Sequence, residues 1–187
     1  MNWEIDSTHS HVAFAVRVLS ITTTRGHFNT FRGELHIDEQ NPAKSWVDAQ
    51  VDVTSIDTHN KLRDAHLRSA AFFDVKKYST ITFTSTNIEH VSGQDYQVTG
   101  NLTLHGVTRP ITFVVHYRGQ NSMMDTRTVL SASATLNRHD FSLGQGATVR
   151  LAASSMVNVE IDLEAVQQAV EGHDTNARSE LVSSKKS

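Results

Sequence analysis

The sequence predicts an all-β fold on three observations: alternation of apolar and polar residues dominates it, only one stretch has clear helical spacing, and turn residues separate the alternating segments. Apolar side chains at every second position place one face of a β-strand against a core. Eight segments show this pattern, at residues 12–18, 31–37, 47–53, 81–84, 96–104, 111–117, 129–136 and 157–163. One-sided alternation of this kind is typical of antiparallel sheets with a single buried face.

A sheet with one apolar face must pack against a partner or close on itself. Few helices are predicted to cover it, so a closed barrel or a β-sandwich is favoured. Eight strands is also the number at which a barrel interior holds its own side chains or one small ligand. The connections at Glu39–Pro42, Ser92–Asp95 and Gly119–Ser122 have the composition of hairpin turns. The alternation alone does not decide between barrel and sandwich.

The stretch at residues 60–73 breaks the alternation. Leu62 and His66 fall on one face at helical spacing, which predicts a short amphipathic helix. Either Thr58 or Asn60 has the side chain to cap its first turn.

The composition is that of a folded protein, with 187 residues, 38% hydrophobic residues and a net charge of −3. We expect one domain over residues 1–170 and a disordered polar tail over residues 171–187. The slightly negative net charge gives no indication of binding to nucleic acid or to an anionic membrane surface. The 11 histidines make the charge sensitive to pH.

The chain contains no cysteine, which excludes disulfides, thiolate catalysis and zinc–thiolate sites. No apolar run approaches the ~18 residues that a membrane-spanning helix requires. Neither a basic segment nor an apolar leader precedes the first predicted strand. A cytoplasmic location is therefore expected for the sequence as it stands, and a periplasmic one if a leader has been removed.

Several separated motifs, in this order, resemble the YceI family of polyisoprenoid-binding, lipocalin-like proteins. They stand at residues 3–16 (WEIDSTHSHVAFAV), 55–58, 63–69, 72–74, 78–85, 100–110 and 136–143. The resemblance extends over roughly residues 3–166. Three positions depart from the family pattern: Val18 replaces a His, Ser79 a Pro and Ser142 a Gly. These are turn or loop positions, so the fold is not expected to change.

The resemblance implies an eight-stranded antiparallel closed barrel with a short helix near one opening. It also implies an apolar tunnel that holds a polyisoprenoid or a similar long-chain lipid, such as an isoprenoid quinone or its precursor. The lipid is then a ligand, and no catalytic cofactor or metal is expected. A homodimer is a further expectation from the family.

The apolar side of each strand, together with Leu67 of the helix, supplies the candidate lipid-binding residues. They are Phe14, Val16, Leu35, Ile37, Val51, Val53, Leu67, Phe83, Leu102, Leu104, Phe113, Val115, Val159 and Ile161. The alternative is that these side chains fill a solid core.

Arg63, Asp64 and His66 are the candidates for contact with a lipid head group, because an Arg and a His near an opening can bind a phosphate or carbonyl oxygen. The alternative is a network that docks the helix, with Asp57 bonded to Arg63 or Asp64 bonded to a backbone N–H.

The motifs of common catalytic sites are missing or weak. His9 and His11 lie on one side of a strand, but no third metal ligand follows at a fixed spacing. Asp6, His9 and Ser10 are near in sequence, which does not make a catalytic triad. There is no phosphate-binding Gly-rich loop and no G-x-S-x-G motif.

Three functions therefore remain. The first is lipid binding without chemistry. The second is an enzyme that acts on such a lipid, with His66 or His9 as acid–base. The third is an interaction or stress module whose barrel is filled.

Overall fold

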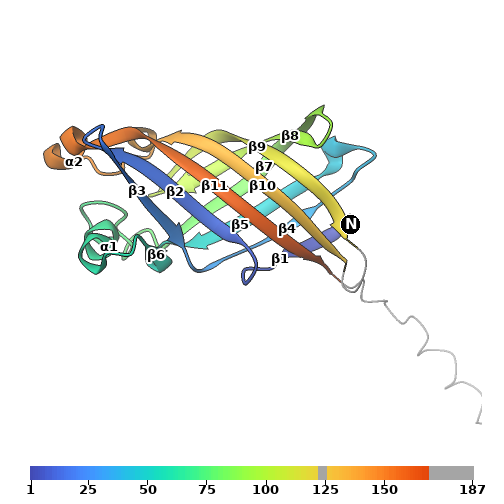
Figure 1. Cartoon of the computed structure of the whole chain (residues 1–187), viewed down its shortest axis with the longest axis horizontal. Helices are drawn as coiled ribbons and strands as arrows, with labels where there is room; N and C mark the ends of the chain where they lie inside the picture. Colours follow the sequence, from blue (N-terminus) through green and yellow to red (C-terminus); the bar gives the residue numbers. More distant parts are fainter. Residues whose placement is uncertain (122–125, 169–187) are drawn as a thin grey trace, which may run out of the picture.

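The computed structural model describes residues 1–121 and 126–168, which form a closed antiparallel β-barrel (Figure 1). The strands are β1 (Asn2–Ile5), β2 (His11–Val18), β3 (Thr22–Phe28), β4 (Phe31–His36), β5 (Trp46–Asp52), β6 (Ile56–Asp57), β7 (Thr80–Ser92), β8 (Asp95–Leu104), β9 (Val107–Asn121), β10 (Arg127–Asn137) and β11 (Ala153–Gln167). The helices are α1 (Lys61–Arg68) and α2 (Ala147–Ala152), with 3-10 turns η1 (Pro42–Lys44), η2 (Val53–Ser55) and η3 (Arg138–Phe141). The predicted tail at residues 171–187 lies outside the described residues.

These strand segments fill eight positions around the barrel. The strands β1 and β2 occupy one position, because both pair with the same edge of β11. The next position holds β3 and β4, which pair with β2 and β1 respectively. The third holds β5 and β6, which pair with β4 and β3. Strands β7 to β11 follow in chain order, and the pairing of β11 with β1 closes the ring. The predicted eight-stranded closed barrel is confirmed.

The barrel has two distinct ends (Figure 1). We call one the helical end, because α1 and the connection with η3 and α2 lie there beside the β2–β3 and β8–β9 turns. The other is the hairpin end, formed by the loop at residues 37–45 and the β7–β8 turn. The predicted short helix near one opening is thus confirmed.

The strand β3 escaped prediction because few of its residues are apolar. Gly26 stands opposite Phe14 across the β2–β3 ladder. A Cβ atom at Gly26 would lie 2.5 Å from Cζ of Phe14, so only glycine leaves room for that ring. The missing side chain both hides the alternation and makes space for a neighbouring aromatic ring.

The predicted helix is shorter than the stretch at residues 60–73. The Asn60 side chain caps it by accepting a hydrogen bond from the Arg63 N–H at 3.0 Å. The helix ends at Arg68, where the Ser69 N–H bonds to the His66 carbonyl. Residues 69–79 then return to β7 in turns. The turn predicted at Gly119–Ser122 was wrong in its position, because β9 continues to Asn121.

Candidate functional site

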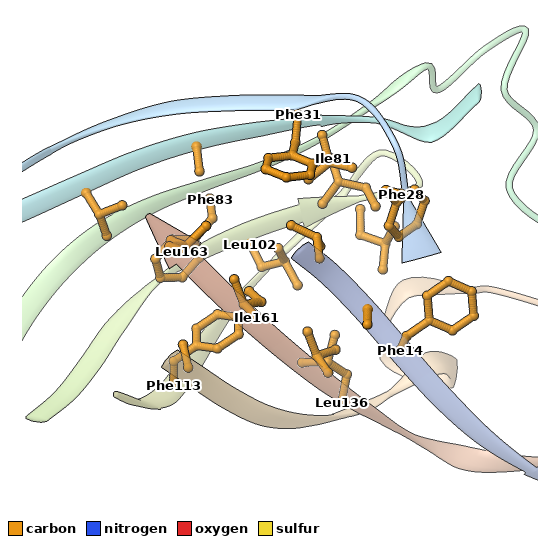
Figure 2. Close-up of a pocket in the computed structure, with 18 of the residues that line it drawn as sticks. Phe14, Phe28, Phe31, Ile81, Phe83, Leu102, Phe113, Leu136, Ile161 and Leu163 are labelled. Atoms are coloured by element: carbon orange, nitrogen blue, oxygen red, sulfur yellow. The ribbon is translucent and has the colours of Figure 1, made fainter. Parts of the chain in front are cut away.

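The barrel encloses a cavity of about 440 Å³. Its lining includes residues from both ends of the barrel, so it runs along the barrel axis. Ten of the side chains around it, all apolar, are labelled in Figure 2: Phe14, Phe28, Phe31, Ile81, Phe83, Leu102, Phe113, Leu136, Ile161 and Leu163. The volume falls in the range of small-molecule sites, about 300–1,000 Å³. The interior is hollow, so the alternative of a solid core is wrong.

The structure places nearly all predicted lining residues along this cavity. They are Phe14, Val16, Leu35, Ile37, Val51, Leu67, Phe83, Leu102, Leu104, Phe113, Val115, Val159 and Ile161. Val53 does not belong to the lining. Because β5 ends at Asp52 and Val53 begins the η2 turn, the alternation breaks there, and Val53 is buried against Phe28 and Ile56 instead. Contact of the other residues with a lipid stays a prediction.

Several lining residues were missed. Phe31 and Leu163 continue the apolar side of predicted strands, so the alternation itself could have identified them. Phe28 lies on the unpredicted strand β3, and Phe141 lies in the η3 turn. No periodic pattern marks these last two positions.

At the helical end, Arg63 and His66 line the cavity and Asp64 does not. The Arg63 side chain donates from Nε to the Thr58 hydroxyl and from Nη2 to the Thr58 carbonyl, each at 2.8 Å. Within the described residues, the His66 ring has no hydrogen-bond partner. His66 is therefore the head-group candidate with the most freedom to bind a ligand.

Asp64 instead docks the helix to the preceding loop. Its carboxylate accepts hydrogen bonds from the Thr58 N–H at 2.9 Å and from the Thr58 hydroxyl at 2.6 Å, and the side chain is buried. The assignment of Asp64 to a head group was wrong, and the docking alternative holds for it. The docking pair of Asp57 with Arg63 is not formed, because Asp57 accepts from the His59 N–H.

A buried cation that the sequence did not single out as a site residue, Arg138, also lies along the cavity. Its guanidinium donates to the carbonyls of Leu143, Gly144, Val149, Ala153 and Ser154 at 2.9 to 3.4 Å. Burial lowers the pKa of Arg138. An arginine has five N–H donors, and these carbonyls occupy all of them. Arg138 therefore holds the β10–β11 connection in place and has no donor left for a ligand.

The hairpin end is bridged by polar contacts. The Tyr117 hydroxyl of β9 donates to a Glu39 carboxylate oxygen at 3.0 Å, and Gln120 donates to the same oxygen at 3.3 Å. At the same end, where β4 and β5 meet the loop at residues 37–45, the His36 and Trp46 rings stack with their centroids 6.3 Å apart. Most polar residues along the cavity lie near one of its ends, and its middle is apolar.

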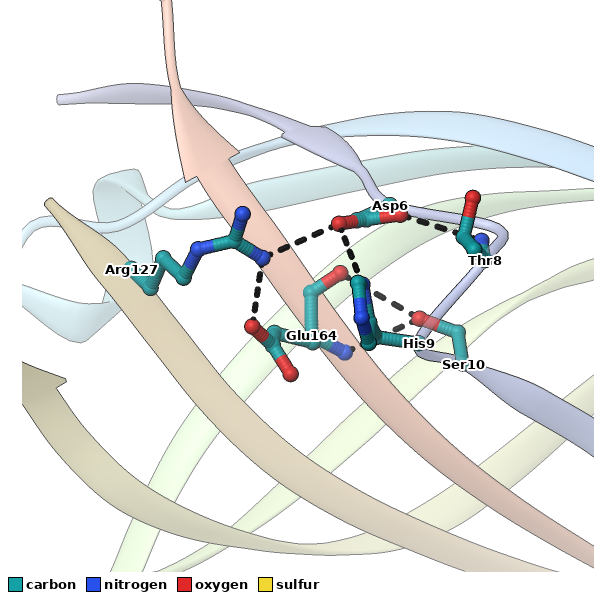
Figure 3. Close-up of polar contacts among 6 residues, drawn as sticks. All are labelled: Asp6, Thr8, His9, Ser10, Arg127 and Glu164. Carbon is teal, nitrogen blue, oxygen red and sulfur yellow. Dashed lines mark hydrogen bonds and ion pairs between the residues drawn. The ribbon is translucent and has the colours of Figure 1, made fainter. Parts of the chain in front are cut away.

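Asp6, His9 and Ser10, three of the residues considered for a metal or a triad, lie in a structural network on the barrel wall (Figure 3). Asp6 pairs with His9 at 2.9 Å and with Arg127 at 3.0 Å, and Arg127 also pairs with Glu164. The single guanidinium pairs with both carboxylates and offsets part of their charge, which weakens their attraction for a metal ion. The Ser10 hydroxyl donates to the Glu164 carbonyl and accepts from the Glu164 N–H. Ser10 therefore ties the segment just before β2 to β11 and does not bond to His9.

The described residues contain no helix long and apolar enough to cross a membrane.

Known proteins resemble this chain in both sequence and fold. A UPF0312 protein of Vibrio parahaemolyticus is 36% identical over 162 residues, which cover 86% of this chain and 83% of the relative. The crystal structure of Burkholderia cenocepacia BcnA superposes with a TM-score of 0.80 at 25% identity, over 86% of this chain and 98% of that one. A polyisoprenoid binding domain from Saccharophagus degradans has the same fold, with a TM-score of 0.71 at 20% identity, over 89% of this chain and 98% of that domain.

The family comparison agrees with these likenesses. Residues 3–169 match the YceI-like domain. This range runs from β1 to the end of β11. Since the match includes every strand of the closed barrel, the chain belongs to the YceI-like family.

Proposed function

We propose that this protein binds a long apolar lipid of the polyisoprenoid class inside its barrel and carries or stores it without changing it chemically. An isoprenoid quinone or its precursor falls in this class. One observation carries the proposal: the cavity is continuous along the barrel axis, and its middle is lined by aliphatic and phenyl side chains. An extended hydrocarbon chain fits such a lining better than a compact polar metabolite does.

The energetics favour such a ligand. Burial of apolar groups is worth about 0.8 kcal/mol per carbon group, so one five-carbon isoprenoid unit contributes roughly 4 kcal/mol before the cost of ordering the chain. Few units suffice for tight binding, because a dissociation constant of 1 nM corresponds to only about −12 kcal/mol. A strong grip on the head group is not required, and selectivity should follow the length and girth of the chain.

The ends of the cavity suit the polar part of such a lipid. His66 and Arg63 lie at the helical end and can meet a phosphate, hydroxyl or quinone oxygen. The Saccharophagus degradans domain, described as polyisoprenoid-binding, supports the same ligand class through its shared fold. By the family resemblance we also propose a homodimer, which light scattering of the purified protein measures.

Native mass spectrometry of the purified protein, followed by organic extraction, tests the proposal. The key variant is Ala132→Phe, because Ala132 lies on the cavity wall in β10 and a phenyl ring there would occupy the tunnel. The matched control is Ser133→Phe, which adds the same ring at the exposed neighbouring position of the same strand.

We expect a co-purifying long-chain lipid in the wild type and in Ser133→Phe, and its loss in Ala132→Phe. A wild-type protein that is empty and also ignores added prenols and quinones would overturn the proposal.

A further inference from the structure

Four aliphatic side chains project from the helical end into solvent. Leu19 is 66% exposed, Ile21 85%, Leu62 84% and Leu151 87%. These are the most exposed large apolar side chains in the described part of the chain. Single exposed aliphatics are ordinary on a protein surface, but a group of them at one end is not.

The backbone of Leu19 also has a left-handed conformation, which is unfavourable for leucine. Leu19 and Ser20 have φ of +53° and +57°, and the Ile21 N–H bonds to the Val18 carbonyl at 3.2 Å. Two successive left-handed residues form a type I′ turn, in which Asn, Asp or Gly is strongly preferred. A leucine here costs stability through its backbone and again through its exposure. Neither cost is explained by the packing of the barrel.

The four side chains surround the helical end of the cavity. The Leu19 N–H bonds to the Ala152 carbonyl at 2.7 Å, which joins the β2–β3 turn to the end of α2, where Leu151 lies. Leu62 is on α1, whose Leu67 lines the cavity. Figure 1 shows α1, α2 and the β2–β3 turn together at this end.

Positive charge gathers at the same end. The segments that form the helical end contain nine Lys or Arg and four Asp. These segments are residues 17–22, 53–79, 104–110 and 137–153. The remaining described residues contain five Lys or Arg and twelve Asp or Glu. Exposed Lys61 and Arg150 directly precede Leu62 and Leu151 in the chain, and exposed Arg17 lies two residues before Leu19.

We propose that the helical end docks on a lipid bilayer that contains anionic head groups. The four aliphatic side chains enter the head-group boundary, and the neighbouring Arg and Lys side chains contact lipid phosphates. Aliphatic tips flanked by basic residues are typical of interfacial membrane binding, and each basic group near an anionic surface adds to the attraction. Docking in this way places the helical end of the cavity against the bilayer.

A bilayer suits this surface better than a protein partner does. The four side chains project from one turn and two helices at the helical end, whereas a stable protein interface needs a contiguous, well-packed apolar patch. The proposal goes beyond lipid binding in the cavity and holds whether or not the cavity is occupied.

Flotation with vesicles tests the proposal on the full chain. The variant carries Leu19→Asn, Ile21→Thr, Leu62→Gln and Leu151→Gln together. Asn suits the left-handed turn position, so the fold should be kept while the apolar groups are removed. The matched control is Val91→Thr, which removes an apolar group that is 57% exposed at the hairpin end.

We expect the wild type and Val91→Thr to float with vesicles of phosphatidylcholine and phosphatidylglycerol, and less with phosphatidylcholine alone. The four-substitution variant should bind at least about tenfold more weakly, since each buried aliphatic group contributes about tenfold. Failure of the wild type to float, or equal flotation of the variant, would overturn the proposal. The proposal would also be overturned if the wild type did not bind vesicles and instead formed a dimer that the four substitutions dissociate.

The test separates docking from ligand binding in the cavity. A variant that no longer floats but still holds its lipid in native mass spectrometry would support docking as a distinct property. A wild type that floats but holds no lipid would refute the proposed ligand and leave the docking surface intact.

Discussion

Tyr117 of β9 and Glu39 of the loop that follows β4 are joined by a hydrogen bond of 3.0 Å, although β9 and β4 stand on opposite sides of the barrel. Since β4 and β9 are separated by three positions in either direction around the ring, this bond spans the hairpin end. Burial raises the pKa of Tyr117, so the phenol stays protonated and remains a donor. The hairpin end is thus bridged by polar contacts, whereas the helical end presents apolar side chains to solvent. A lipid is therefore expected to pass through the helical end.

The change Tyr117→Phe tests the role of this bond. It removes one hydrogen bond and should lower the free energy of unfolding by about 1 kcal/mol, as measured by denaturant titration. If the hairpin end is normally closed, the change should also speed the release of a bound lipid to acceptor vesicles. Tyr96→Phe is the control, because the Tyr96 ring lies beside Tyr117 while its hydroxyl has no bonding partner in the described part of the chain. Equal release rates for both variants and the wild type would show that the bond between Tyr117 and Glu39 does not restrict the passage of lipid at this end.

The contact between Gly26 and Phe14 gives a second prediction. In Gly26→Ala, the new Cβ atom would lie 2.5 Å from the Phe14 ring and 2.8 Å from the Thr58 methyl group, so these side chains must move. Overpacking of this kind costs about 1–3 kcal/mol, which thermal or chemical unfolding can measure. Adding Phe14→Leu should recover part of the loss, and a double-mutant cycle gives the coupling between the two sites. Strictly additive effects would show that the ring does not limit the residue at position 26.

The comparison of sequence with structure shows where alternation is a sufficient guide. It predicted one strand for each of the eight positions and the inward side of each strand, because a one-residue shift would turn every apolar side chain toward solvent. It left barrel and sandwich open, and the closed barrel was implied by the family resemblance. It failed at Val53, where a 3-10 turn replaces the strand, and at β3, where Gly26 takes the place of an apolar residue. Both failures come from tertiary packing, which a local pattern does not contain.

The polar parts of the site were harder to predict. Arg63 and Asp64 are adjacent on one helix, yet only Arg63 lines the cavity, because Asp64 turns back to Thr58. The link between Glu39 and Tyr117 joins residues that are 78 positions apart. The net charge of −3 does not reveal the separation of basic and acidic residues along the barrel, because a sum over the whole chain does not say where each charge lies.

The different roles of Asp64 and His66 can be separated by mutation. Asp64→Ala leaves the buried Thr58 N–H and hydroxyl without their acceptor and should lower the free energy of unfolding by about 2–3 kcal/mol. His66→Ala removes an exposed ring without a partner in the described residues and should change stability by less than about 0.5 kcal/mol. When only the folded fraction of each variant is compared, His66→Ala should weaken lipid binding more than Asp64→Ala does. A stability loss in His66→Ala as large as that in Asp64→Ala would contradict this division.

The network around Asp6 predicts sensitivity to acid. The hydrogen bond from His9, followed by that from Arg127, holds the pKa of Asp6 well below its ordinary value of 3.8. A carboxyl whose pKa is lower in the folded state than in the unfolded state stabilises the fold above the unfolded pKa. That contribution is lost as the pH falls below about 4 toward the folded pKa, because the unfolded chain then binds a proton that the folded chain does not.

Asp6→Asn should therefore be less stable than the wild type at neutral pH, and the difference should shrink as the pH falls below about 4. The melting temperature, followed by circular dichroism over a pH series, measures both effects. Asp162→Asn serves as the control, because Asp162 is exposed on the same strand as Glu164 and lies outside the network. Parallel pH profiles for the wild type and Asp6→Asn would mean that the ion pairs of Asp6 with His9 and Arg127 contribute nothing to the stability of the barrel wall.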